Sequence, residues 1–168
     1  MQAVQLTMVK RAIRVRPARR ADAPAIARLA AELARHVEDP DPRLTSERVV
    51  ALGFGPRAMT RYLVATQGGA VVGMAAFGTH VDLHMDLPTV YLSDLSVDPA
   101  ARGTGAGRAL MAAVARIALE RGAVLRWGIW QANAQALAFY EACGAARLDE
   151  DVFTMGLDGA ALEAMAAA

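Results

Sequence analysis

Three glycines at alternate positions, Gly103, Gly105 and Gly107, stand between Arg102 and Arg108. A β-rich run ends shortly before them, and a helical pattern follows. The N-terminus of a helix leaves about four N–H groups unpaired and carries a partial positive charge. Glycines let an anion approach those groups, and the arginines add positive charge. The stretch therefore predicts an anion site long enough for a pyrophosphate, unless the turn merely needs glycine conformations.

Two familiar glycine-rich loops do not fit this stretch. A P-loop continues with Lys and then Ser or Thr after its last glycine, whereas Arg108 and Ala109 follow here. The dinucleotide fingerprint needs G-x-G-x-x-G near the first strand and an acidic residue about 20 positions later. Here the spacing is G-x-G-x-G, in the middle of the chain. Both of these nucleotide-binding classes are excluded.

The surrounding elements must carry this loop from a strand into a helix. Alternation and turn residues predict strands, and apolar side chains at helical spacing predict helices. An antiparallel meander followed by a strand–helix–strand crossover gives a mixed α/β fold with two parallel strands. The strands are expected at 12–18, 61–66, 70–78, 89–97, 124–130 and 152–157, with a loop at 80–88. The helices are expected after the caps Asp22 and Thr45, and at 105–121, 135–143 and 158–168.

Composition limits the classes of protein and partner. A chain of 168 residues fits one domain, in which residues 1–10 form a flexible tail. A net charge of +1 argues against nucleic acid, and no uncharged apolar run is long enough for a membrane span. The single cysteine, Cys143, cannot form an internal disulfide, and no apolar leader is evident. We therefore expect a cytoplasmic protein.

The loop and a second motif resemble one family. Residues 102–107 match the Q/R-x-x-G-x-G/A motif of the GNAT family of N-acetyltransferases, and "YLSDLSVDPAARG" looks like the strand that leads into it. Further on, Asn133, Tyr140, Glu141 and Gly144 give the pattern N-x6-YE-x2-G. The resemblance covers residues 12–158. It implies the GNAT fold for residues 1–168: one domain with a mixed, mostly antiparallel sheet of about seven strands, helices on both faces, and parallel, splayed strands four and five.

The resemblance also implies acetyl-CoA as co-substrate. The backbone of Leu95 and Val97 would pair with the pantetheine arm, because a bulge after Asp94 splays strand four from strand five. Asn133 would hydrogen-bond that arm, and Tyr140 would give a proton to the leaving sulfur, unless its ring simply packs under its helix. The full set implied for the cofactor is Leu95, Ser96, Val97, Arg102, Gly103, Thr104, Gly105, Ala106, Gly107, Arg108, Asn133 and Tyr140.

The reaction implied is direct acyl transfer from a thioester to an amine. An alkylammonium has a pKa of about 10 and must lose a proton before it attacks. Asp94 is expected either to accept that proton through water or to attract a cationic substrate; alternatively it lies on a solvent-facing side. Ser93, on the opposite side of the strand, Trp130 at the end of strand five, and His36 on the first helix are the other candidates for the acceptor site.

Among GNAT proteins the chain looks most similar to the diamine and thialysine acetyltransferases, the spermidine/spermine group. That group carries "YLED" where residues 91–94 read "YLSD", so Ser93 replaces a glutamate. A small-molecule amine and a homodimer are therefore expected. Peptide or protein N-acetylation and a non-catalytic acyl-CoA sensor are the alternatives. His80 and His84, with Asp82 and Asp86, lack a convincing third ligand, so we expect no metal site.

Overall fold

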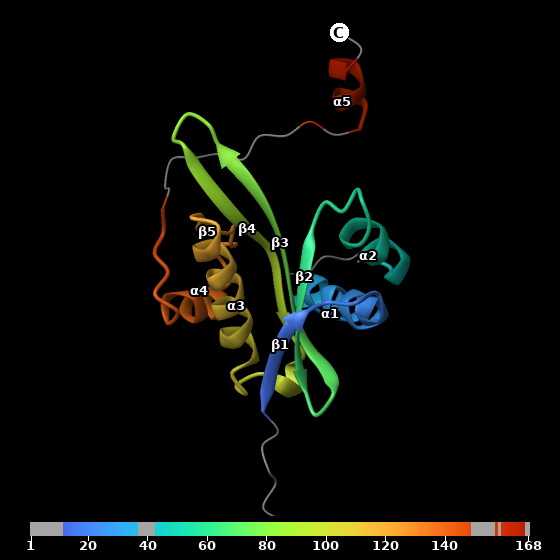
Figure 1. Ribbon diagram of the computed structural model, residues 1–168, viewed down its shortest axis with the longest axis vertical. Helices are drawn as coiled ribbons and strands as arrows, with labels where there is room; N and C mark the ends of the chain where they lie inside the picture. The colour runs from blue at the N-terminus through green and yellow to red at the C-terminus, as the bar shows by residue number, and fades with distance from the viewer. Residues whose placement is uncertain (1–11, 37–42, 149–156, 158, 167–168) are drawn as a thin grey trace, which may run out of the picture. The chain divides into compact units, whose positions relative to one another are not determined.

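A computed structural model describes residues 12–36, 43–148, 157 and 159–166 (Figure 1). The chain divides into two compact units, Met1–Gly128 and Ile129–Ala168. The predicted strand at 152–157 and the predicted tail at 1–10 lie largely or wholly outside the described residues. The first unit contains the sheet and the glycine-rich loop.

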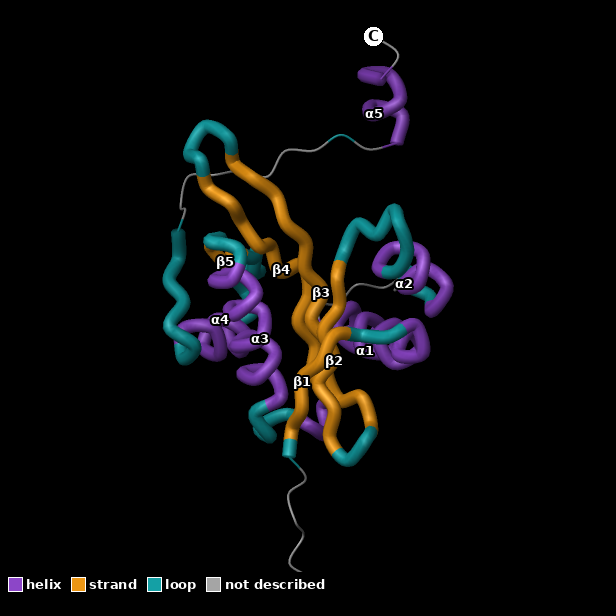
Figure 2. Tube along the Cα trace, viewed as in Figure 1, coloured by secondary structure: helices purple, strands orange, loops and turns teal. Residues whose placement is uncertain are grey.

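The first unit is built on one sheet in which strands follow one another in chain order (Figure 2). The first four strands are antiparallel, and the last pair is parallel. This is the predicted meander followed by a crossover, with five strands within the described residues. The strands are β1 (Ile13–Pro17), β2 (Arg61–Gln67), β3 (Ala70–Asp82), β4 (Leu87–Val97) and β5 (Val124–Arg126).

Helices cover both faces of this sheet. α1 (Ala23–His36) and α2 (Ser46–Gly53) pack on one face, and α3 (Ala106–Glu120) lies on the other (Figure 1). Two short 3-10 turns, η1 (Arg20–Asp22) and η2 (Pro99–Ala101), precede α1 and α3. The predicted cap of α2 is present, because the Thr45 hydroxyl accepts the N–H of Arg48 at 3.2 Å. The second unit contains α4 (Ala134–Glu141) and α5 (Gly159–Ala166).

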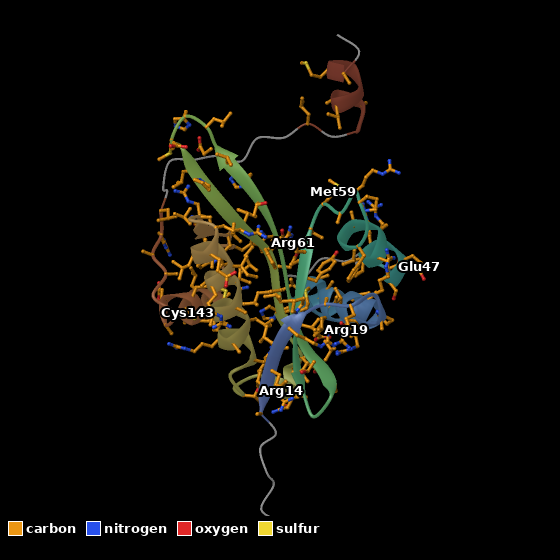
Figure 3. All side chains as sticks on the ribbon, viewed as in Figure 1. Arg14, Arg19, Glu47, Met59, Arg61 and Cys143 are labelled. Atoms are coloured by element: carbon orange, nitrogen blue, oxygen red, sulfur yellow. The ribbon has the colours of Figure 1, made fainter. Side chains whose placement is uncertain are left out.

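The core follows the amphipathic patterns of these elements. Ile26 and Leu29 of α1 are completely buried, as is Val49 of α2, and they pack on Val64 and Met74 of the sheet. Burial of such side chains supplies about 1.5–3 kcal/mol each, which fixes α1 and α2 to their face. The outward positions are charged: Arg14, Arg19, Glu47 and Arg61, labelled in Figure 3, are all exposed.

Asp22 differs from its predicted role as a simple helix cap. Its carboxylate accepts both terminal nitrogens of Arg16, at 2.7 and 2.8 Å, and the backbone N–H of Arg19 at 2.7 Å. The Arg16 guanidinium holds the pKa of this carboxyl below its ordinary value. Charge-assisted bonds of this kind are among the stronger ones in proteins. Asp22 thus ties the end of β1 to the start of α1.

Two predicted boundaries are wrong. Residues 80–88 were expected as a loop, but β3 and β4 extend to Asp82 and Leu87 as a long hairpin. Cross-strand pairing down to Asp82 and Leu87 overrides the polar composition of that stretch. A strand was expected over 124–130, but β5 ends at Arg126. Its pairing with β4 covers only three residues, and the parallel ladder stops there.

Candidate functional site

Just before the glycine-rich loop, one edge of β4 pairs with no strand of the described residues. Its parallel pairing with β5 ends where Tyr91 meets Arg126. β4 then continues to Val97, paired with β3 on its other side. Within the described residues, no strand pairs with the β5-facing edge of residues 92–97. The peptide groups along such an edge can pair with an extended ligand. Leu95 and Val97 lie on this stretch, as the predicted splaying of the two strands requires.

The loop after β4 is held by its own hydrogen bonds. The Asp98 carboxylate accepts the N–H of Ala100 at 3.3 Å and so closes the η2 turn. The carbonyl of Ala101 then accepts the Thr104 hydroxyl at 2.6 Å and the Thr104 N–H at 3.3 Å. The Thr104 side chain is therefore engaged within the loop.

Two of the three alternate glycines have a conformational reason. Gly103 and Gly105 have φ values of 73° and 93°, in the left-handed region that favours glycine. A side chain at either position would meet open space, so strain rather than crowding selects glycine there. Gly105 is the N-cap of α3 and has no side chain to cover the first N–H groups of the helix. Those of Ala106 and Gly107 have no carbonyl within α3 to bind.

This arrangement fits an elongated anion with an extended arm. Arg102 and Arg108 are exposed on either side of the glycines, and the helix terminus adds partial positive charge. The edge of β4 that has no strand partner within the described residues leads directly into this loop. A pyrophosphate attached to a linear amide chain, the chemistry of coenzyme A, matches both features.

A β-bulge determines the face on which Asp94 lies. Asp94 pairs with Ala76, but Leu92 pairs with Phe77, so Ser93 is an extra residue. The bulge was expected after Asp94 and instead lies before it. Strict alternation would place Asp94 on the same face as Leu92. The extra residue shifts the register, so Asp94 shares the face of Ala76, which is the face covered by α1 and α2.

Asp94 is half-buried there, and its carboxylate has no ion pair or hydrogen bond within the described part of the chain. Burial raises the pKa of this carboxyl above its ordinary value. A carboxylate placed in such surroundings favours a cationic or proton-donating partner. The geometry is therefore suited to an amine.

Tyr62 is a neighbour of Asp94 that sequence reasoning missed. Tyr62 pairs with Ala76 from β2 while Asp94 pairs with Ala76 from β4, so the three lie in one row across the sheet. Burial raises the pKa of the Tyr62 hydroxyl, and the charge of Asp94 raises it further. The ring packs against the end of α2, where a Cβ on Gly53 would lie 2.0 Å from it. The sequence alone does not show this row, because it arises from the pairing of β2 and β4 with β3.

The other predicted residues of the first unit have different placements. The Ser96 side chain is buried and its hydroxyl donates to the Leu29 carbonyl of α1 at 2.9 Å, so Ser96 can offer only its backbone to a ligand. Ser93 is exposed at the bulge. His36 is exposed at the last position of α1.

The second unit carries the remaining predicted residues. Asn133 is the N-cap of α4, and its side-chain oxygen accepts the N–H of Ala136 at 3.0 Å. Tyr140 is half-buried on α4, with its ring edge-on to Phe139 at 5.1 Å between centroids. Trp130 is 67 % exposed and lies beyond the end of β5, not on that strand as expected.

The described residues offer neither a cluster of metal ligands nor a membrane-spanning helix. Across the described ranges, no three His, Cys, Asp or Glu side chains are grouped so that they could hold a metal ion. His84 instead pairs with Asp82 at 2.6 Å near the hairpin tip. In the same ranges, no helix has the length and apolar character needed to cross a bilayer.

Comparison with known proteins decides the family. The model of the acetyltransferase (GNAT) family matches residues 26–145, which include β4, the glycine-rich loop and α4. The chain belongs to the GNAT family. Thialysine N-epsilon-acetyltransferases from Bos taurus and Mus musculus are each 32% identical to it, over 82% of this chain and 86% of theirs. These relatives make the chain an N-acetyltransferase, and their name matches the group it was expected to resemble.

Solved structures agree on the GNAT fold. An integron cassette protein from the V. cholerae mobile metagenome has a TM-score of 0.76 and 21% identity, over 93% of this chain and 98% of that one. A possible acetyltransferase from Clostridium difficile 630 has a TM-score of 0.75 and 22% identity, over 88% and 99%. Both likenesses concern the fold alone.

Proposed function

We propose that this GNAT protein transfers an acetyl group from acetyl-CoA directly to a primary amine of a small molecule. The observation that carries the proposal is that β4, on an edge without a strand partner among the described residues, runs into the glycine-rich loop. The acceptor would be a diamine, a polyamine or an amino-acid-like amine. We further propose that residues 1–168 act as one acetyltransferase domain and that the protein is a cytoplasmic homodimer.

Backbone groups would hold the acetyl donor. The peptide groups of Leu95 and Val97 pair with the pantetheine arm, and the Val97 N–H polarises the thioester carbonyl. The N–H groups of Gly103, Gly105, Ala106 and Gly107, with Arg102 and Arg108, bind the pyrophosphate. Asn133 donates a hydrogen bond from its side-chain nitrogen to the pantetheine arm, because its side-chain oxygen already caps α4.

Side chains would move the protons. Asp94 accepts, through water, the proton that the acceptor ammonium must lose. The amine nitrogen then bonds to the acetyl carbon, the carbon–sulfur bond breaks, and the nitrogen releases its second proton to solvent, from which Tyr140 is later reprotonated. Tyr140 gives its hydroxyl proton to the leaving sulfur, which suits a residue protonated at neutral pH. The raised pKa of Asp94 makes it a better base than an ordinary surface carboxylate.

The acceptor class is supported by Asp94, which has no ion pair or hydrogen bond among the described residues, and by the relatives. A carboxylate on the α1/α2 face attracts a cationic amine, and the curated relatives are named for thialysine, an amino acid with a side-chain amine. Ser93, Trp130 and His36 remain candidates for further contacts with the acceptor.

Thiol release from acetyl-CoA tests the proposal. Wild type and Tyr140→Phe are compared on a panel of thialysine, diamines, polyamines, amino acids, aminoglycosides and short peptides. We expect release with one class of small amine, and a decrease of about 10²-fold or more in turnover for Tyr140→Phe, with unchanged acetyl-CoA affinity. Release only with peptides would contradict the small-molecule acceptor. Tight binding of acetyl-CoA without release for any amine would indicate a sensor.

A further inference from the structure

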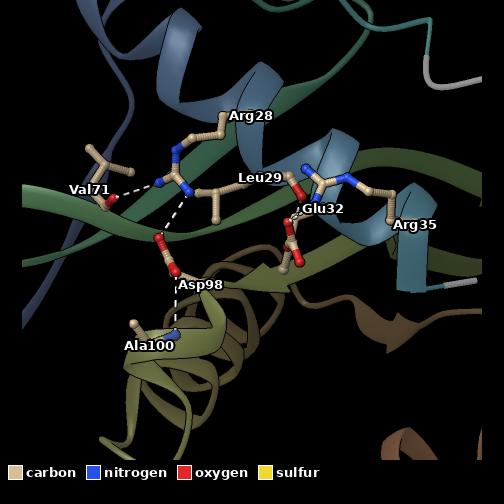
Figure 4. Close-up of polar contacts among 8 residues, drawn as sticks. Arg28, Leu29, Glu32, Arg35, Val71, Asp98 and Ala100 are labelled. Carbon is tan, nitrogen blue, oxygen red and sulfur yellow. Dashed lines mark hydrogen bonds and ion pairs between the residues drawn. The ribbon is translucent and has the colours of Figure 1, made fainter.

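A side chain of α1 contacts the start of the glycine-rich loop. Arg28 donates one nitrogen to the Asp98 carboxylate at 2.9 Å and a second to the Val71 carbonyl of β3 at 3.4 Å (Figure 4). Asp98 follows directly after β4 and begins the η2 turn. One guanidinium therefore links α1, β3 and the first residue of the loop.

Asp98 is also fixed by its backbone. Its N–H donates to the Val72 carbonyl at 2.9 Å. Val72 is the extra residue of a second β-bulge, because Gly73 pairs with Ala65 while Val71 pairs with Thr66. A bulged residue stands outside the ladder with its neighbour strand, so its carbonyl can bind elsewhere. The second carboxylate oxygen of Asp98 binds Ala100 and closes the turn.

The neighbouring residue of α1 makes a second attachment to β4. The Leu29 carbonyl accepts a hydrogen bond from the buried Ser96 hydroxyl. Arg28 binds Asp98, which follows Ser96 by two positions. α1 therefore holds β4 on both sides of Val97. The attachment at Ser96 is buried, whereas the one at Asp98 is partly exposed.

Asp98 places a negative charge beside a loop that is expected to bind an anion. Asp98 is the only acidic residue between positions 98 and 108. A carboxylate beside a pyrophosphate repels it unless a cation neutralises it. The side chains of Arg28 and Asp98 are 48% and 28% exposed, and ion pairs this exposed contribute little to folding stability. We therefore expect the ion pair to affect anion binding at the loop more than the free energy of unfolding.

We propose that Arg28 is a positioning residue for acetyl-CoA binding. It neutralises Asp98 and holds that carboxylate against the turn that presents Gly103 and Gly105. The inference rests on the proposed function, because it concerns the same pyrophosphate loop. Arg28 itself does not touch the reacting atoms.

Calorimetric titration with coenzyme A tests the pair. We expect about fivefold weaker binding for Arg28→Ala, which leaves Asp98 charged and without the guanidinium that neutralises it. Asp98→Asn keeps an oxygen for Ala100 and removes the charge, so we expect about a twofold loss. The double variant should bind like Asp98→Asn and therefore more tightly than Arg28→Ala alone. A second substitution that restores affinity is not expected from a merely structural contact.

Arg35→Ala is the matched control. It removes an arginine from the same helix and breaks an ion pair with Glu32 that stays within α1 (Figure 4). We expect its coenzyme A affinity to equal that of wild type. In turnover assays Arg28→Ala should raise the KM for acetyl-CoA and leave kcat at saturation unchanged.

Two results overturn the inference while the proposed function stands. One is a coenzyme A affinity of Arg28→Ala equal to wild type. The other is a double variant whose loss equals the product of the two single losses. Failure of wild type to bind coenzyme A overturns the proposed function and this inference with it.

Discussion

The glycine-rich loop and the row around Asp94 differ in the kind of group that they present to a ligand. The loop offers backbone N–H groups, and its conformation depends on the positive φ of Gly103 and Gly105. The row around Asp94 offers side chains, one carboxylate and one hydroxyl, aligned by strand pairing. A site made of backbone is damaged by adding a side chain, whereas a site made of side chains is damaged by removing an atom. We therefore expect that binding of the donor and choice of the acceptor can be altered separately.

The largest expected effect is on the backbone site. Gly105→Glu forces a residue with a Cβ into a left-handed conformation and adds a negative charge beside the predicted pyrophosphate. We expect coenzyme A affinity to fall more than about 100-fold in calorimetric titration.

Gly122→Glu is the control for this variant. Gly122 lies just beyond the opposite end of α3, has a φ of 60°, and offers equally open space. The substitution causes similar strain with its charge away from the loop, so coenzyme A affinity should be retained. Equal losses in the two variants would mean that strain, and not the anion site, explains the result.

The next effect concerns the side-chain site. Asp94→Asn removes the predicted base and cation anchor, and we expect kcat/KM for the amine to fall about 10²-fold, with coenzyme A affinity unchanged. Glu120→Gln, which neutralises an exposed carboxylate at the last position of α3, is the control and should change kcat/KM little. Loss of coenzyme A affinity in Asp94→Asn would contradict the separation of the two sites.

The same variant should alter the pH dependence of stability. The folded protein raises the pKa of Asp94, so its ionisation costs stability as pH rises above the unfolded value of about 3.9. Asp94→Asn avoids that cost and should melt above wild type at pH 7, with the difference shrinking toward pH 4.

The opposite sign is expected for Asp22. Asp22 has a lowered pKa, so Asp22→Asn should melt below wild type at pH 7. Melting curves at several pH values measure both.

The smallest effect is expected for Tyr62. Tyr62→Phe keeps the ring that packs against α2 and removes the hydroxyl near Asp94. We expect the KM for the amine to rise about threefold, consistent with loss of one modest polar contact. Tyr91→Phe removes a hydroxyl from exposed Tyr91 of β4 and is the control. Identical KM values for wild type and Tyr62→Phe would mean that the Tyr62 hydroxyl does not contribute to binding of the amine.

The backbone site was easier to predict from the sequence than the side-chain site. Glycine spacing is a local signal, and the loop, its arginines and the helix after it lie where they were expected. The face of Asp94 depends on the register between β3 and β4, which no local pattern encodes. Tyr62 lies 32 positions earlier and joins Asp94 only through the pairing of both with Ala76. Non-local pairing also explains the hairpin at 80–88, where polar residues suggested a loop.

The bulge at Ser93 makes the chain unusually sensitive to insertions and deletions at this point. Side chains alternate across a strand, so loss of one residue in β4 would turn every later side chain to the other face. Asp94 would then move to the α3 face, and Ser96 would lose the Leu29 carbonyl that it binds. We expect changes in length to be tolerated at the β3–β4 hairpin tip but not between Leu92 and Asp98.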